Sequence, residues 1–234
     1  IKIIFLKFQV FYRTSKIFGK NPINGVDPFI TLKSLLKSFT PEEIIIICDN
    51  TTEEQYLNFA KQFPIVYKTC LGNSGSFQLS IKLTKIHKGE IYYFVEDDHL
   101  HLPEQKTWIK AGLKLFDFIS LYDHPDKYFL EMYKKLKRTI KITPLGYFTS
   151  TPSTVMTFAC LASTLENSKE ILLHEKLTGE TLKQPNDYNL FKVLKNHGYT
   201  LGTPIPGRST HCEENLLSPF VNWDQYIKEL KKEI

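Results

Sequence analysis

The feature that most constrains the fold is a pair of short, continuous apolar runs that each end in acidic residues. Ile44–Cys48 stops at Asp49, and Ile91–Val95 stops at the three carboxylates of residues 96–98. An apolar run without polar alternation is typical of a strand buried on both faces, as in a parallel sheet. The two runs therefore predict strands of a parallel sheet whose ends carry polar groups.

Helical patterns separate the strand-like runs. Ile1–Val10 is strand-like, and Asp27-Pro28 predicts a helix start with the aspartate as N-cap and the proline in the first turn. Thr51 with Glu54 has the pattern of a capping box and predicts a second helix start. Alternating strands and helices predict an α/β fold with a doubly wound, mostly parallel central sheet and helices on both faces.

The second half of the chain is less regular. Two strand-like runs, Thr139–Thr143 and Thr154–Cys160, predict a small antiparallel addition to the sheet. Helices are expected from Pro103 to about Leu115, at 128–137, and over Leu161–Glu175, Asp187–Asn196 and Asp224–Lys232. A chain of 234 residues fits a single domain over 1–234.

Polar residues gather where the predicted strands end. Asp49 and Asn50 follow one strand, the small-residue loop Gly72–Ser76 follows the next, and residues 96–98 follow a third. In open α/β sheets ligands bind beyond the carboxyl ends of the strands. We therefore expect these groups to face one binding site.

Three consecutive carboxylates, Glu96, Asp97 and Asp98, carry the strongest chemical signal. Placed together they raise each other's pKa unless a cation neutralises them. A hard divalent ion, Mn²⁺ or Mg²⁺, does this and also binds a diphosphate. The alternative is an acidic turn that caps the helix near Pro103. His99, beside the cluster, is a group that supports the metal ligands, an acceptor-side group or a surface imidazole, and the same holds for His101.

The motifs "ICDN", "GNSGSF" and "YYFVEDDHLHLP" occur in this order in the first half. With them the chain resembles the GT-A glycosyltransferases, in particular their family-2-like branch, over most of its length. "EDD" matches the DxD-type motif of that family, with Glu96 where many members have aspartate. The resemblance implies that Asp98 binds the metal directly, and that Glu96 or Asp97 reaches the ribose or a metal-bound water.

The resemblance also implies a donor site and a division of the chain. Residues 1–102 would form the nucleotide-sugar-binding half, and 103–234 the acceptor-binding half. Asp49 would pair with the nucleobase or act only as a helix cap, and "GRSTHCEEN" would complete the site or form an ordinary surface loop. The other donor-side candidates are Arg13, Asn50, Gly72, Asn73 and Ser74, with His211 as a metal ligand and Arg208 on the leaving diphosphate.

An inverting transferase needs a base that deprotonates the acceptor hydroxyl. The order of residues in the resembled family implies Asp187, which is equally suited to begin a helix. Asp123 and His124 follow a predicted strand and are expected on the acceptor side. The predicted function is metal-dependent transfer of a sugar from a UDP-, GDP- or dTDP-linked donor to a hydroxyl acceptor of glycan, lipid or protein type. The alternatives are a nucleotidyltransferase that acts on a sugar phosphate and a catalytically silent nucleotide-sugar-binding module.

The net charge and the cysteines bear on the class of ligand and on the cellular compartment. The net charge of +5 suits a phosphate-bearing ligand but does not predict nucleic-acid binding. The densest basic stretch, Lys134–Lys141, is either a solvated helix face or a patch for an anionic partner. Four cysteines without a CxxC pair predict reduced thiols, and neither a signal peptide nor a transmembrane segment is expected. We predict a cytoplasmic protein, either free in the cytoplasm or at the periphery of a membrane.

Overall fold

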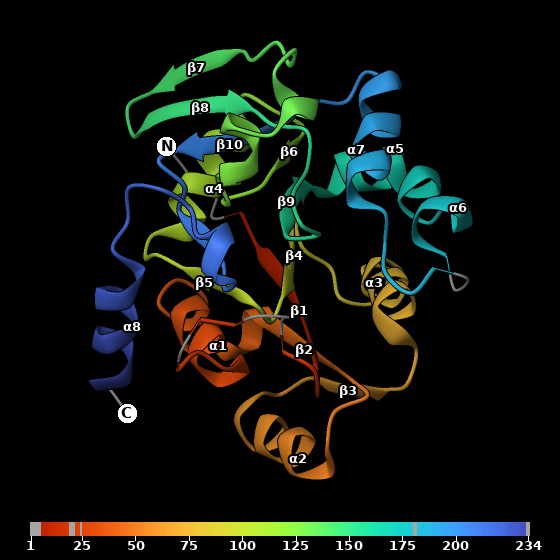
Figure 1. Ribbon diagram of the computed structural model, residues 1–234. Coiled ribbons are helices and arrows are strands. Elements are labelled where there is room, and N and C mark those ends of the chain that lie inside the picture. Colours follow the sequence, from red (N-terminus) through yellow and green to blue (C-terminus); the bar gives the residue numbers. More distant parts are fainter. Residues whose placement is uncertain (1–5, 19–21, 24, 180–181, 233–234) are drawn as a thin grey trace, which may run out of the picture.

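The computed structural model describes residues 6–18, 22–23, 25–179 and 182–232. Its centre is a nine-stranded sheet in the order β3-β2-β1-β4-β9-β6-β10-β8-β7 (Figure 1). A second, two-stranded sheet pairs β11 with β5. The strands are β1 (Phe8–Ser15), β2 (Ile44–Asp49), β3 (Val66–Thr69), β4 (Ile91–Glu96), β5 (His99–His101), β6 (Phe118–Ile119), β7 (Ile140–Thr143), β8 (Gly146–Ser150), β9 (Phe158–Leu161), β10 (Leu201–Ile205) and β11 (Ser209–His211).

The strand directions confirm the predicted sheet. The first four strands in the order, β3, β2, β1 and β4, are mutually parallel. β9 then lies antiparallel between β4 and β6, and β10 is parallel to β6. The hairpin of β7 and β8 joins the far edge in antiparallel fashion. These antiparallel strands are the small addition expected from the second half of the chain.

Helices cover both faces of the sheet. One buried cluster contains side chains of α1, α2 and α4, and a second contains side chains of α3, α5 and α7. A third cluster joins α8 to α1, as the position of α8 in Figure 1 shows. The helices are α1 (Pro28–Leu36), α2 (Glu53–Gln62), α3 (Gly72–Leu83), α4 (Gln105–Leu113), α5 (Ala162–Leu172), α6 (Glu175–Thr178), α7 (Asp187–Asn196) and α8 (Trp223–Lys232).

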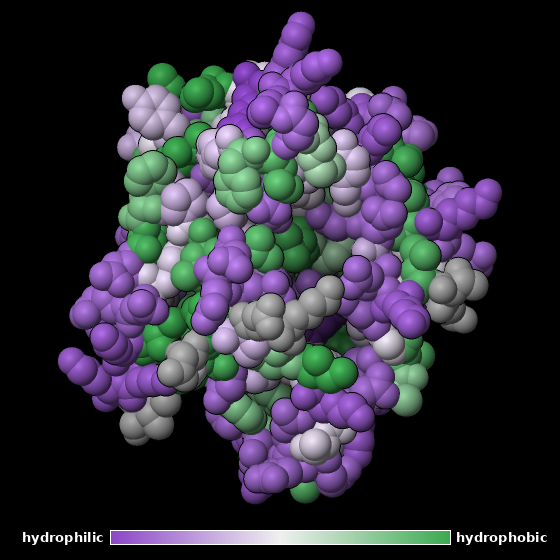
Figure 2. Space-filling model, in the orientation of Figure 1, coloured by the Kyte–Doolittle hydropathy of each residue, from purple (hydrophilic) through white to green (hydrophobic). Residues whose placement is uncertain are grey.

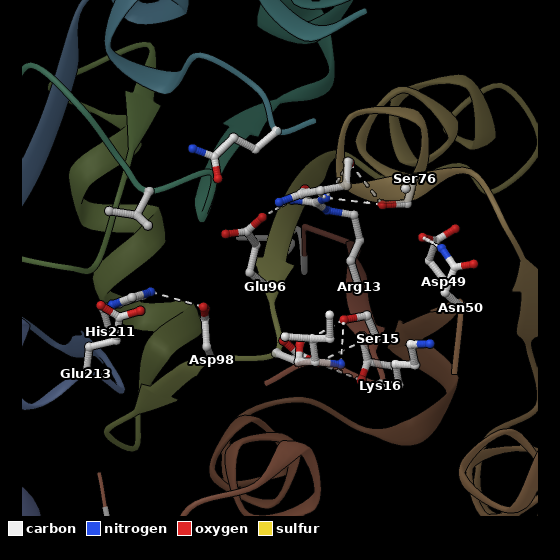
Figure 3. Close-up of a pocket in the computed structure, with 17 residues that line it drawn as sticks. Arg13, Ser15, Lys16, Asp49, Asn50, Ser76, Glu96, Asp98, His211 and Glu213 are labelled. Carbon is white, nitrogen blue, oxygen red and sulfur yellow. Dashed lines mark hydrogen bonds and ion pairs between the residues drawn. The ribbon is translucent and has the colours of Figure 1, made fainter. Parts of the chain in front are cut away.

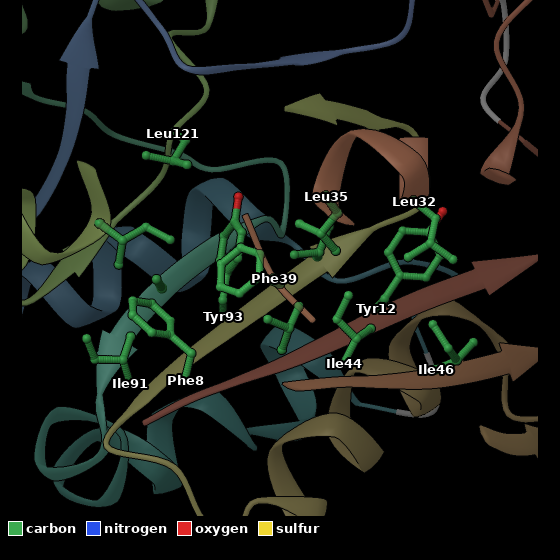
Figure 4. Packing of buried hydrophobic residues seen from close by; sticks show 14 of the residues in the cluster. Phe8, Tyr12, Leu32, Leu35, Phe39, Ile44, Ile46, Ile91, Tyr93 and Leu121 are labelled. Atoms are coloured by element: carbon green, nitrogen blue, oxygen red, sulfur yellow. The ribbon is translucent and has the colours of Figure 1, made fainter. Parts of the chain in front are cut away.

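The isoleucine run of β2 is apolar throughout because both of its faces are covered. Ile44 and Ile46 pack with α1 and α2 on one side, whereas Ile45 and Ile47 pack with α3 on the other. Successive side chains of a strand point to opposite faces, so a doubly covered strand needs apolar residues at every position. Figure 4 shows the first of these clusters around Phe8, Tyr12, Ile44 and Tyr93.

Several predicted boundaries were wrong. The first strand spans Phe8–Ser15 rather than Ile1–Val10, of which residues 1–5 lie outside the described part. It continues through Arg13 and Thr14 because carboxylates near the end of β4 bind these polar side chains in the interior. The capping box of α2 is one residue later than expected, with the Thr52 side chain accepting a hydrogen bond from the Gln55 amide.

Two further segments differ from prediction. The small-residue stretch Gly72–Ser76 is not a loop but the first turn of α3, whose Gly72 has a φ of 74°. The segment 128–137 is not the predicted helix. One 3₁₀ turn, Pro125–Tyr128, ends at its first residue, and a second, Glu131–Tyr133, lies within it. Pro125 and the local pairing of Lys127 with Asp123 favour this tighter winding near its start.

Candidate active site

A cleft of about 630 Å³ opens at the carboxyl ends of β1, β2 and β4. We call it the acidic cleft, because five carboxylate residues are among those that line it. Nine of the predicted site residues line it: Arg13, Asp49, Asn50, Gly72, Asn73, Glu96, Asp97, Asp98 and His211. Figure 3 shows Asp98 and His211 at one end and Asp49 and Asn50 at the other, with Arg13 and Glu96 between them.

The two predicted metal ligands meet because β5 pairs with β11. The register sets His211 opposite His99, directly after Asp98. The His211 Nε2 lies 3.0 Å from one oxygen of Asp98, and the His99 Nδ1 lies 2.9 Å from the other. The backbone amide of Cys212 donates to the Asp98 carbonyl at 2.7 Å, which fixes the turn.

Asp98 and His211 stabilise each other's charged forms. Burial pushes the Asp98 pKa upward, but the hydrogen bonds from His211 and His99 outweigh it and place the pKa below its ordinary value. Burial lowers the pKa of His211, and the Asp98 carboxylate more than reverses this, so that the net shift is upward. Asp98 is therefore ionised at neutral pH.

Asp97 points away from Asp98, toward β1. Its Oδ2 accepts hydrogen bonds from the Thr14 hydroxyl at 2.7 Å and the Ser15 amide at 3.1 Å. Its backbone carbonyl accepts a third from the Thr31 hydroxyl at 2.6 Å. Burial and the nearby charge of Asp98 raise the pKa of Asp97 well above its ordinary value. These contacts tie the end of β4 to β1 and α1.

Glu96 forms a buried ion pair with Arg13. The Arg13 Nη2 lies 2.6 Å from Glu96 Oε1, and its Nη1 donates to the carbonyl and side-chain oxygens of Asn73 at 3.0 and 2.7 Å. The guanidinium also lies 5.4 Å from the centre of the Phe77 ring. Burial raises the pKa of Glu96 to about 7, although the Arg13 charge opposes the shift.

Asp49 is held at the far end of the cleft by the connection between β3 and α3. One carboxylate oxygen accepts from the Thr69 hydroxyl at 2.8 Å and the Leu71 amide at 2.6 Å. The other accepts from the Asn50 side-chain amide at 2.8 Å. Asn50 itself has a φ of 55°, a left-handed conformation that asparagine tolerates better than most residues. The carboxylate orientation is thus fixed in the protein without a ligand.

Arg208 and Ser74 do not line the acidic cleft. Arg208 donates to the Pro103 carbonyl at 3.1 Å and lies over the Trp108 ring. Ser74 is buried in α3 beside Gly75. His99 and His101 are fully buried rather than on the surface, with His101 Nε2 2.6 Å from the Tyr93 hydroxyl.

The remaining acceptor-side candidates lie together outside the cleft lining. Asp123 is fully buried and pairs with Lys127 at 2.8 Å, and the Tyr128 hydroxyl donates to the same carboxylate. The His124 Nδ1 accepts from the Asp126 amide and caps a 3₁₀ turn.

Asp187 holds a loop that forms one wall of the cleft. Its carboxylate accepts from the Thr154 amide and hydroxyl at 3.0 and 2.8 Å and from the Val155 amide at 3.1 Å. Val155 and Met156 have φ values of 49° and 52°, strained for residues of these types. Because Val155 lines the cleft, Asp187 acts on the site at least through this loop.

Ser76, the last residue of the predicted small-residue stretch, also lines the cleft, and the lining residues that escaped the sequence analysis are Thr14, Ser15, Lys16, Ile17, Val155, Gln184 and Glu213. The helical start at Gly72 places Ser76 one turn beyond it and next to Arg13, a contact that a loop would not predict. Glu213 follows His211 at a spacing of two, so extended backbone places it on the same side. Nothing in the local sequence marks Val155 or Gln184, which come from distant connections.

The residues present suit a hard divalent cation that shares its coordination with a phosphate ligand. Among the described residues no three histidine, cysteine or acidic side chains gather closely enough to hold a metal alone. Mg²⁺ and Mn²⁺ sites that bind phosphates need only one or two protein ligands, with waters and phosphate oxygens as the rest. Asp98 and His211, whose atoms already converge, supply such a pair.

The architecture is that of a GT-A-like fold. A structure of GalNAc-T7 with UDP, GalNAc and Mn²⁺ superposes with a TM-score of 0.59 at 14% identity and covers 89% of this chain. Staphylococcus aureus TarS (1–349) gives a TM-score of 0.50 at 17% identity over 85% of this chain. The matched regions are 44% and 58% of those two chains, so this chain spans about half of each.

A third similar structure is CMP:2-keto-3-deoxy-manno-octonic acid synthetase complexed with CTP. It gives a TM-score of 0.51 at 12% identity and covers 97% of this chain and 100% of that one. Comparison of the sequence with protein families and with curated proteins finds no match. At these identities the similarities establish the fold, and the chemistry has to come from the cleft.

Proposed function

We propose that this protein transfers a sugar from a nucleotide-diphosphate donor to a hydroxyl acceptor. The observation that carries the proposal is the convergence of Asp98 and His211, 3.0 Å apart, in a cleft at the carboxyl ends of parallel strands. The same cleft contains a fixed carboxylate, Asp49, at its opposite end. This spacing suits an elongated ligand with a polar base at one end and a diphosphate at the other.

Each part of such a donor has a candidate partner in the cleft. Asp49 and Asn50 offer an acceptor and a donor for the nucleobase or ribose. Gly72 and Asn73 begin α3, so their backbone amides and the positive end of the helix face the nucleotide. Lys16, which is exposed and lines the cleft, takes the diphosphate role that the sequence had suggested for Arg208.

Asp98 and His211 would hold Mn²⁺ or Mg²⁺. When bound, such an ion supplies positive charge that stabilises the leaving diphosphate. Asp98 remains ionised for this purpose because His211 and His99 hydrogen-bond its two oxygens. Glu96 neutralises Arg13 and keeps the guanidinium against Asn73, where it shapes the floor of the cleft.

An inverting reaction further requires a base, and Asp187 remains our prediction for it. Its carboxylate is occupied by the Thr154 and Val155 amides, which lower its basicity, whereas burial raises its pKa above the ordinary value. Asp187→Asn should leave donor binding intact and stop transfer. Transfer by this variant at the unmodified rate would restrict Asp187 to holding the 154–156 loop.

Thermal shift tests the donor proposal directly. UDP-, GDP- and dTDP-linked sugars are added with and without Mn²⁺, and the expected result is a rise in Tm for one donor that requires the ion. An Asp98→Asn variant serves as the control, because it keeps the shape of the side chain and removes its charge. Stabilisation by every donor to the same degree in both proteins would contradict the proposal.

A nucleotidyltransferase is the second candidate, favoured by the full-length similarity to the CTP-bound synthetase. It predicts stabilisation by a free nucleoside triphosphate and release of pyrophosphate when a sugar phosphate or sugar acid is added. A catalytically silent module predicts donor binding without either reaction. Product analysis by mass spectrometry separates the three.

A further inference from the structure

Exposed apolar side chains concentrate in one stretch of the surface. Of the fifteen large hydrophobic residues that are exposed in the described chain, eight lie between Tyr128 and Tyr147. We call this stretch, 128–147, the basic–apolar face. Its exposed apolar members are Tyr128, Phe129, Leu130, Met132, Ile140, Ile142, Leu145 and Tyr147.

The same stretch is the most basic part of the protein. It contains five cationic residues and one acidic residue, Glu131, which pairs with Lys134. Lys134, Lys135 and Lys137 are exposed. Figure 2 shows purple and green side chains side by side over the region of β7 and β8 at the top of the molecule. Positive charge and apolar surface therefore reach solvent together.

The face is built on fixed structure. Lys127 and the Tyr128 hydroxyl both contact the buried Asp123, which anchors the start of the face. Arg138 lies 4.5 Å from the centre of the Tyr128 ring and donates to the Lys127 carbonyl, which joins the two ends of the 3₁₀ segment. Beyond it, β7 and β8 form a regular antiparallel hairpin. Binding by this face requires no large ordering of the chain.

The outward side of the hairpin is apolar at the edge of the sheet. β7 is the last strand of the sheet, and its Ile140 and Ile142 are 63% and 73% exposed. Between them, Lys141 turns inward, donates to the Leu115 carbonyl and lies over Phe116. An exposed apolar edge strand is an aggregation liability unless something covers it.

A second cleft, of about 480 Å³, adjoins the face between β8, β10 and α7. Four lysines are among the residues that line it and no carboxylate is: Lys137, Lys141, Lys192 and Lys195. We call it the lysine cleft. Tyr188 and Tyr199 add aromatic walls. Such a lining attracts an anionic group of about the size of a phosphorylated headgroup and accepts apolar atoms beside it.

We propose that the basic–apolar face binds the surface of an anionic phospholipid bilayer, with a headgroup phosphate in the lysine cleft. Interfacial binding combines apolar side chains that enter the headgroup region with cations that attract anionic lipids. A second copy of the chain on this face would bring two sets of positive charges together. A nucleic acid would satisfy the lysines but offer little to Ile140, Ile142 and Met132.

Co-sedimentation with vesicles tests the proposal and needs no donor, so its outcome is independent of the transferase assignment. The protein is mixed with vesicles of phosphatidylcholine alone or of phosphatidylcholine with phosphatidylglycerol. We expect binding to the anionic vesicles only, and weaker binding as sodium chloride is raised. Equal binding to both vesicles, or to neither, would overturn the proposal.

Matched variants locate the binding surface. Combined Lys134→Gln, Lys135→Gln and Lys137→Gln should lower the partition coefficient about a hundredfold, at roughly fivefold for each cation. The control removes the same charge elsewhere, at three exposed lysines: Lys61→Gln, Lys85→Gln and Lys228→Gln. A control that loses as much binding as the test variant would show only a net-charge effect and would overturn the assignment of this face.

A second variant tests the apolar residues of the basic–apolar face, and further measurements test whether another partner covers it. Ile140→Ser with Ile142→Ser should weaken vesicle binding at high salt, where apolar contacts dominate. If this variant instead abolishes a concentration-dependent dimer seen by analytical ultracentrifugation, a second copy covers the face and the bilayer proposal fails. Inorganic phosphate should displace the protein from vesicles better than chloride at equal ionic strength, because it competes for the lysine cleft. The proposal fails if single-stranded RNA binds more tightly than the vesicles.

Discussion

The acidic cleft and the lysine cleft hold charge in opposite ways. In the acidic cleft Arg13 is 5% exposed and bound to Glu96 and Asn73, and Asp98 is hydrogen-bonded to two histidines. In the lysine cleft Lys137, Lys192 and Lys195 extend from the surface, and no carboxylate is part of the lining.

The comparison teaches that the two clefts have different physical uses. Buried, paired charges are costly to disturb and therefore fix geometry, as a site that positions a reacting ligand requires. Exposed positive charges without nearby carboxylates contribute little to the stability of the fold, but they attract anions over a long range. The charge arrangement of the acidic cleft suits the orientation of a ligand, whereas that of the lysine cleft suits the attraction of an anion.

Arg13→Leu should have the largest effect on the fold. It leaves Glu96 buried without its partner, and we expect a loss of about 3 kcal/mol or more in the free energy of unfolding. Urea denaturation followed by circular dichroism measures this. A double variant with Glu96→Leu should recover part of the loss, because no unpaired charge then remains. A double variant less stable than Arg13→Leu would mean that the pair is not the source of the cost.

Asp98→Asn should have the largest effect on ligand binding. It removes the charge that the cation would meet, and we expect donor affinity in the presence of Mn²⁺ to fall at least about tenfold to a hundredfold. Isothermal titration calorimetry measures this, with Asp224→Asn on the exposed first turn of α8 as the control. The variant should still bind anionic vesicles, since the lysine cleft is untouched. Equal loss of both activities would indicate misfolding.

Asp187 should make stability depend on pH in a predictable direction. Its folded-state pKa is raised by burial, so the folded protein binds this proton more readily than the unfolded chain. The stability of the native protein relative to Asp187→Asn should therefore increase as the pH falls through the raised folded value toward the ordinary carboxyl range near about 4. Denaturation midpoints of both proteins between neutral and acidic pH provide the test. If the stability of the native protein relative to Asp187→Asn decreased on acidification, the prediction would be wrong.

Removing charge from the lysine cleft should have the smallest effect on the fold. In three single variants, Lys137→Gln, Lys192→Gln and Lys195→Gln should each change the free energy of unfolding by no more than about 0.5 kcal/mol. Donor binding in the acidic cleft should stay the same in calorimetry. A large loss of stability would show that these lysines are structural and would remove the contrast between the clefts.

The sequence predicted the parts of the site that depend on strand ends. Parallel strands bring their carboxyl ends to one edge, so Asp49 and residues 96–98 line the same cleft. Asp97 and Asp98 form the turn between β4 and β5, and their side chains leave it in different directions, Asp97 to β1 and Asp98 to His211. Arg208 lies just before β11, and its side chain contacts the Pro103 carbonyl and the Trp108 ring instead of the cleft.

The remaining parts depend on tertiary pairings that no local pattern encodes. The burial of His99 and His101 follows from the pairing of β5 with β11 and from the hydroxyl of Tyr93. The contacts of Asp187 exist because α7 begins beside the 154–156 loop, far away in sequence. Two 3₁₀ turns near 125–133 take the place of the start of a predicted helix, beside Pro125 and the ion pair of Lys127 with Asp123.

The pairing of β5 with β11 has a consequence for how the protein matures. Asp98 and His211 are separated by 113 positions in the chain. Contacts of such long range form only after much of the loop entropy has been lost, and they tend to form late in folding. The contact between Asp98 and His211 is therefore absent from a partly folded or incompletely synthesised chain. If the pair holds a cation as proposed, a chain that has not finished folding would lack that site, and the proposed activity would arise only when folding is complete.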